Sequence, residues 1–142
     1  MKKKTVKSVL AVVTALSMMS SITVMAKEEN KTASQEDFLN DLKTGIENRW
    51  EISDNGGDTA SMSSDEVVKF DTNLVNAEYD LLKKYKDCTF DNAKFTMLAD
   101  AYITALETQL NGIKYYKDSN SVYLQYWNAG YNVRAITFPD FV

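Results

Sequence analysis

Four acidic side chains have the spacing that acid–base chemistry or cation binding would need. Asp71 and Glu78 lie seven residues apart in one predicted helix. Asp100 and Glu107 have the same spacing in the next. Seven residues are about two helical turns, so each pair shares a face, and two such faces could hold a hard cation or an acid/base pair. We favour a solvated face for all four acids, because acidic residues are seldom buried. A small hydrolase that uses paired carboxylates is the alternative.

Other common catalytic chemistries lack the residues they require. The sequence contains no histidine and a single cysteine, Cys88. This excludes Ser-His-Asp and Cys-His nucleophile systems and a structural zinc site, and a di-iron bundle lacks its Glu-x-x-His motif. Cys88 is expected to be a half-buried packing residue, with an intermolecular disulfide or a reactive thiol as alternatives. We therefore predict no catalytic residue, no metal site and no cofactor, and a protein that is not an enzyme.

Arginines and aromatic residues are the remaining candidates for a binding surface. The chain contains only two arginines, and each lies in a predicted helix that also contains aromatic residues. The structural interpretation is that they tie the first and last helices to acids on neighbouring helices, and the functional one is an anion clamp. A helical stripe of aromatics is more often core, but adjacent pairs cannot all face inward. The candidate binding residues are Arg49, Trp50, Tyr115, Tyr116, Tyr126, Trp127 and Arg134.

The first 26 residues have the pattern of a bacterial secretory signal peptide. Four lysines precede an apolar run over residues 9–26, which ends in Val24-Met25-Ala26. Small side chains at these positions favour cleavage after Ala26 and hence secretion. The alternative is an uncleaved segment that anchors the chain in a membrane. Residues 27–33 are polar and are expected to form a flexible N-terminus.

Cleavage would make the chain more acidic and narrow its choice of partners. Four of the 16 basic residues but none of the 20 acidic ones lie in the predicted leader, so the net charge falls from −4 to −8. Nucleic acid and anionic membranes both require a basic surface, and we exclude them as partners. An extracellular protein or a cell-wall component is the expected partner. The oligomeric state is left open.

The mature chain is predicted to be all-α, an up-down bundle of about four helices in a single domain over residues 34–142. Ser34 and Ser63 are each followed three residues later by an acid, which is typical of a helix start. Apolar residues recur at steps of three and four in segments 34–53, 64–86, 92–116 and 122–137. Short links favour antiparallel neighbours. The apolar tail 138–142 is expected to dock on the bundle, unless the domain continues beyond it.

The chain resembles an uncharacterised helical domain of secreted or membrane-tethered proteins in Gram-positive bacteria. The resemblance implies a secreted or membrane-tethered location and a helical fold, and no activity is known for such domains. Those domains continue past the last helix seen here. The matching positions span most of the mature chain and are Phe38, Asp41, Leu42, Gly45, Arg49, Trp50, Tyr85-Lys86-Asp87, Phe90, Tyr102-Ile103, Leu106, Gln109, Trp127, Gly130, Tyr131 and Arg134.

Together these observations predict a secreted, non-enzymatic binding or protein-interaction module. The small extracellular hydrolase remains the alternative. A third class, a partner-specific inhibitor or immunity-type protein, would have the same sequence features as the binding module and is not separated from it by the sequence.

Overall fold

The computed structural model describes residues 31–116, 120–134 and 138. The folded unit discussed below runs from Thr32 to Val142. The predicted leader and its cleavage point lie outside the described residues. The elements are β2 (Lys31–Thr32), α1 (Gln35–Asn55), the short 3-10 helix η2 (Thr59–Ser61), α2 (Ser64–Leu82), the 3-10 turn η3 (Lys83–Tyr85), β3 (Cys88–Thr89), α3 (Ala93–Ile113) and α4 (Asn120–Arg134).

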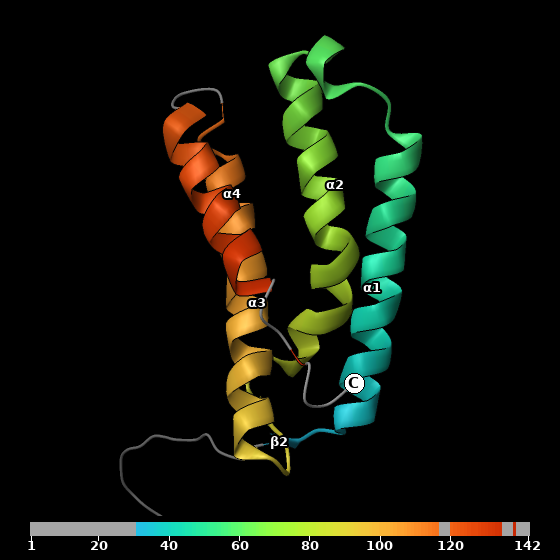
Figure 1. The fold of residues 1–142 in the computed structure, drawn as a ribbon, viewed down its shortest axis with the longest axis vertical. Helices are drawn as coiled ribbons and strands as arrows, with labels where there is room; N and C mark the ends of the chain where they lie inside the picture. The colour runs from blue at the N-terminus through green and yellow to red at the C-terminus, as the bar shows by residue number, and fades with distance from the viewer. Residues whose placement is uncertain (1–30, 117–119, 135–137, 139–142) are drawn as a thin grey trace, which may run out of the picture. The chain divides into compact units, whose positions relative to one another are not determined.

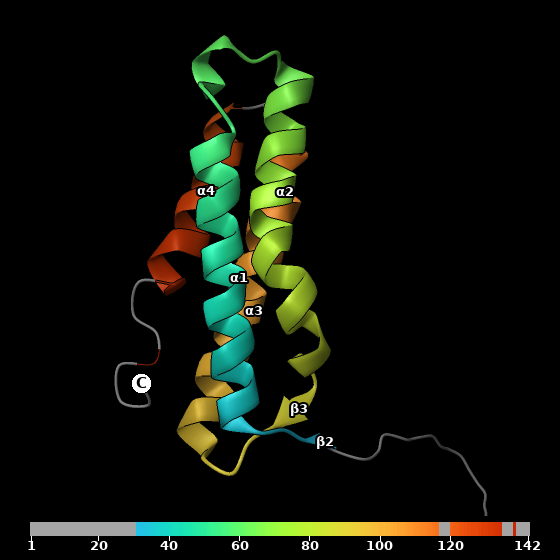
Figure 2. The same cartoon turned by 90° about the vertical axis from the view of Figure 1, so that its right-hand side faces the viewer.

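Successive helices run in opposite directions, and α1 lies beside α2 while α3 lies beside α4 (Figure 1). Turned by 90°, the structure shows α1 and α2 side by side at the front, with α3 and α4 behind them (Figure 2). Contacts between α2 and α3 join the two pairs. The predicted all-α, up-down bundle of four helices is confirmed.

Side-chain caps explain where the helices begin. The Ser34 hydroxyl accepts a hydrogen bond from the Asp37 N–H at 3.2 Å, and the Ser63 hydroxyl accepts one from the Glu66 N–H at 3.3 Å. Asn92 caps α3 in the same way. Each cap satisfies one of the backbone donors that a helix start leaves free. The predicted helix starts at Ser34 and Ser63 are confirmed to within one residue.

The segment before the first helix contains a short strand. Strand β2 pairs with β3, and the Ala33 N–H donates to the Thr89 carbonyl at 2.8 Å. Residues 31–33 of the segment predicted to be flexible therefore have backbone partners in the link after α2, and residues 27–30 lie outside the described residues. Cys88, in that link, is half-buried with its sulfur 3.5 Å from the Lys84 carbonyl oxygen.

Aromatic side chains form one end of the core. Phe38, Phe90 and Phe95 pack edge to face, with ring centroids 4.8–5.6 Å apart. Phe138 joins them although it follows α4, with its ring 5.1 Å from that of Phe95 and only 1% of its surface exposed. The predicted docking of the tail is confirmed at this residue, and 139–142 lie outside the described part. Its φ of 62° is unfavourable for a bulky residue, so ring burial must offset a backbone cost of about 1–2 kcal/mol.

Among the residues that the structure describes, no helix has the length and apolarity needed to cross a membrane.

Candidate functional site

All four helices contribute to a buried ionic cluster centred on Glu78. This carboxylate is fully buried; one of its oxygens accepts a hydrogen bond from Arg49 Nη1 at 2.7 Å and forms an ion pair with Arg134 Nη2 at 3.0 Å. Its other oxygen accepts the Tyr102 hydroxyl. The predicted solvated position of Glu78 is wrong, because two guanidinium groups and a phenol replace water around the charge.

Close packing of two helices places the cluster where it is. A Cβ atom at Gly45 of α1 would lie 2.9 Å from the Cα atom of Glu78 in α2, so only glycine permits this approach. Arg49 lies one turn further along α1 and therefore reaches the Glu78 carboxylate. Arg134 also donates from Nε to the Tyr102 hydroxyl at 3.0 Å. Burial, together with the charge of Glu78, raises the pKa of Tyr102 and keeps its hydroxyl protonated as a donor.

The second acid of α2 is also buried, at a separate contact. Asp71 accepts a hydrogen bond from the Tyr123 hydroxyl of α4. Burial raises the pKa of the Asp71 carboxyl, and the Tyr123 hydrogen bond and the charge of Arg49 oppose that shift. The predicted solvated position is therefore wrong for Asp71 as well.

The two acids of α3 remain close to solvent. Asp100 is exposed, and Glu107 is partly exposed where it contacts Tyr79 and Lys86. The solvated face predicted for these acids is confirmed for Asp100. The four acids do not converge on one cleft.

The two arginines act as ties between helices, which confirms the structural interpretation of both. The guanidinium carbon of Arg49 lies 5.7 Å from the ring centre of Trp127 and 5.9 Å from that of Tyr131. Arg134 lies 5.5 Å from the ring centre of Tyr131. Arg49 Nη2 has no hydrogen-bond partner among the described residues. These geometries fit cation–π stabilisation of partly neutralised guanidinium groups.

Most of the candidate aromatic residues lie where the turn after α3 packs against α4. The rings of Tyr115 and Tyr126 stack at 5.7 Å, and Tyr116 meets Tyr123 edge to face at 4.9 Å. Trp127 stacks on Tyr123 at 5.9 Å. Tyr115, Tyr116, Tyr126 and Trp127 are only partly buried, but they form an inter-helix seam and line no described pocket.

Two glycines, Gly112 and Gly130, allow α4 to lie close to α3. A Cβ atom at Gly130 would lie 2.3 Å from Cγ of Gln109, and one at Gly112 would lie 2.2 Å from Cβ of Tyr126. Gln109 is fully buried, and its Nε2 donates to the Trp127 carbonyl at 3.3 Å. The close contact fixes the orientation of α4, and with it the direction of Arg134.

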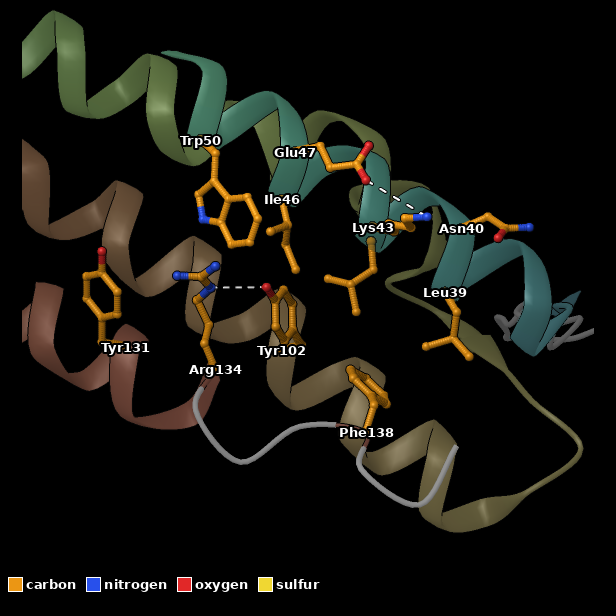
Figure 3. Close-up of a pocket in the computed structure, with 11 residues that line it drawn as sticks. Leu39, Asn40, Lys43, Ile46, Glu47, Trp50, Tyr102, Tyr131, Arg134 and Phe138 are labelled. Carbon is orange, nitrogen blue, oxygen red and sulfur yellow. Dashed lines mark hydrogen bonds and ion pairs between the residues drawn. The ribbon is translucent and has the colours of Figure 1, made fainter. Parts of the chain in front are cut away.

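A pocket of about 780 Å³ opens between α1 on one side and α3, α4 and Phe138 on the other (Figure 3). Figure 3 shows the Arg134 side chain between the Tyr131 ring and Tyr102, with the Trp50 indole next to its guanidinium group. Trp50 is 65% exposed and Tyr131 is 45% exposed. The lining residues are Leu39, Asn40, Leu42, Lys43, Ile46, Glu47, Trp50, Tyr102, Tyr131, Arg134 and Phe138.

The pocket contains two of the predicted binding residues, Trp50 and Arg134. Arg49 lies beneath it in the ionic cluster, and the sequence did not single out Leu39, Ile46 or Tyr131 as binding residues. A signal for the α1 wall was present, because positions 39, 43, 46 and 50 follow steps of four, three and four. That stripe lies beside the core stripe of the same helix.

Among the described residues, no three acidic or cysteine side chains lie close enough together to hold a metal ion.

Comparisons with protein-family profiles, with curated proteins and with solved structures find no match to this chain. The resemblance to a helical domain of Gram-positive bacteria stays a prediction.

Proposed function

We propose that this protein is an extracellular, non-enzymatic binding module that holds its partner in the pocket between α1 and α4. The observation that carries the proposal is the Trp50 side chain, which is 65% exposed on the wall of a concave site. Large apolar side chains exposed in a pocket of this size commonly mark binding sites. An extracellular protein or a cell-wall component is the proposed partner.

The base of the pocket supports this role because it is held in place before any partner arrives. Arg134 and Tyr102 both line the pocket; Arg134 forms an ion pair with the buried Glu78, and Tyr102 donates a hydrogen bond to it. Side chains fixed in this way lose little conformational freedom when a ligand binds. The pocket wall therefore suits recognition by shape.

The alternative of a carboxylate hydrolase finds less support in the geometry. Neither Asp71 nor Glu78 lines the pocket, and each is engaged with side chains of other helices. Among the described lining residues the only carboxylate is that of Glu47, which is exposed and lies 3.9 Å from Lys43. An acid/base pair would need two carboxyl groups facing one cleft.

The proposed extracellular location rests on the signal-peptide pattern of the N-terminus. N-terminal sequencing of the protein recovered from culture medium should give Lys27 as the first residue.

Titration with the neutral apolar dye N-phenyl-1-naphthylamine tests whether the pocket binds apolar groups. We expect a saturable, one-to-one rise in dye fluorescence. Trp50→Ala should weaken dye binding at least about ten-fold, because it removes one wall of the site. Met97→Ala is the matched control, since Met97 is 71% exposed on α3 and lies outside the lining. Equal losses in both variants, or no saturable binding, would refute the proposal.

A further inference from the structure

The exposed surface of α1 is strongly acidic. Every residue of this helix is described, and Lys43 is its only exposed cation, because Arg49 is buried against Glu78. The exposed acids of the helix are Glu36, Asp37, Glu47, Glu51 and Asp54. Because the whole chain is also acidic, with a net charge of −4, its field attracts basic partners to this helix.

The acids flank the exposed tryptophan of the pocket. Glu47 lies three residues before Trp50 and Asp54 four residues after it, so the three share one helix face. Glu51 is adjacent in sequence and also exposed. A cation over the indole face would be attracted both by the ring and by these carboxylates. Of these acids only Glu47 is among the described lining residues, where Lys43 lies 3.9 Å from it. The acidic mouth of the pocket is therefore Trp50 with Glu47, extended by Glu51 and Asp54 on the adjoining surface of α1.

The inner part of the pocket has a different character. Leu39, Ile46 and Phe138 supply apolar walls. The guanidinium group of Arg134 forms an ion pair with Glu78 at 3.0 Å, a carboxylate that it shares with Arg49, and the Arg134 side chain is only 16% exposed. A partner's apolar side chain fits this inner part, and its cationic group fits the acidic mouth.

We propose that the pocket binds a basic amphipathic segment of a partner protein, with an apolar side chain inserted between α1 and α4 and a lysine or arginine held over Trp50. This rests on the proposed function, which it extends by naming the chemistry of the partner. The apolar pocket supplies affinity, and the acidic face of α1 supplies selectivity and faster association.

Peptide binding to the purified chain tests this assignment. The probe is a short fluorescently labelled peptide with leucines on one helical face and lysines on the other. Two companion peptides replace the lysines with glutamine or with glutamate. We expect the lysine peptide to bind about ten-fold more tightly than the glutamine peptide in about 50 mM salt, with the glutamate peptide weakest. Equal or tighter binding of the glutamate peptide would overturn the proposal and indicate an anionic partner.

Protein variants locate the binding site. Trp50→Ala should weaken binding of the lysine peptide about 30-fold. Glu51→Gln combined with Asp54→Asn should weaken it about five-fold in low salt, and high salt should remove this difference. The matched control is Asp91→Asn with Asp100→Asn, which removes two exposed acids outside the lining and should change binding less than two-fold. Equal losses in both double variants would indicate non-specific attraction and overturn the proposal.

The dye and peptide experiments separate the two levels of the argument. If the neutral dye binds at Trp50 but the lysine peptide shows no preference, the partner assignment fails and the binding function stands. If neither binds, both fail. Urea unfolding curves for each variant show whether a loss of binding reflects a loss of fold.

Discussion

Glu78→Gln should be one of the most damaging conservative substitutions in this protein. The change keeps the volume of the side chain but removes the charge that Arg49 contacts at 2.7 Å and Arg134 at 3.0 Å. Because both guanidinium groups are largely buried, neither can replace the lost carboxylate with bulk water. Breaking a buried ion pair on one side costs about 3–5 kcal/mol. That is a large share of the roughly 5–15 kcal/mol that stabilises a typical domain.

Urea unfolding followed by circular dichroism measures this loss. The midpoint should fall markedly with little change in slope. Glu47→Gln is the matched control, since its partner Lys43 lies 3.9 Å away on the surface, and it should cost less than about 0.5 kcal/mol. A triple variant with methionine at positions 49, 78 and 134 should recover much of the stability, because it leaves none of the three charges of the Glu78 cluster without a partner. If Glu78→Gln costs less than about 1 kcal/mol, Glu78 is not the counter-ion of the two arginines.

Three further substitutions test other parts of the argument. Because burial raises the pKa of Asp71 in the folded state, the fold takes up this proton at a higher pH than the unfolded chain. Its contribution to stability should therefore grow as pH falls from 7 towards 4, and Asp71→Asn should abolish that trend in urea unfolding curves; parallel pH profiles would contradict this. Gly45→Ala should destabilise by about 1–3 kcal/mol although alanine favours helices, since its Cβ would meet the Glu78 Cα at 2.9 Å, and an increase in melting temperature would show that α1 and α2 are less closely packed. Phe138→Ala should cost about 3–5 kcal/mol in the same assay, and a surface-like effect would place this ring outside the core.

The architecture was predictable because local signals agree with one another. Serine caps marked the starts of α1 and α2, and the three- and four-residue spacing of apolar side chains marked their buried faces. The sequence also contained the reason for the close approach of α4, in Gly130. The ends of the helices were predicted less accurately than their starts. The helix predicted over residues 64–86 ends as α2 at Leu82 and continues as a 3-10 turn.

The positions of the acids could not be predicted, because they depend on contacts between distant segments. Asp71 and Asp100 look alike in sequence, but one meets Tyr123 across 52 residues and the other faces solvent. The sequence predicted that each arginine would pair with an acid on a neighbouring helix. It did not predict that Arg49 and Arg134 would pair with the same carboxylate. The pocket was missed for the same reason, since its walls come from opposite ends of the chain.

The packing of Phe138 against Phe38 links residues 100 positions apart, with ring centroids 5.5 Å from each other. Four helices can form from local contacts, but this end of the core stays open until the segment after α4 is available. A nascent chain therefore leaves Phe38 and Phe95 without one of their partners until synthesis passes residue 138. Completion of the fold is consequently a late event, and the same event supplies one wall of the pocket.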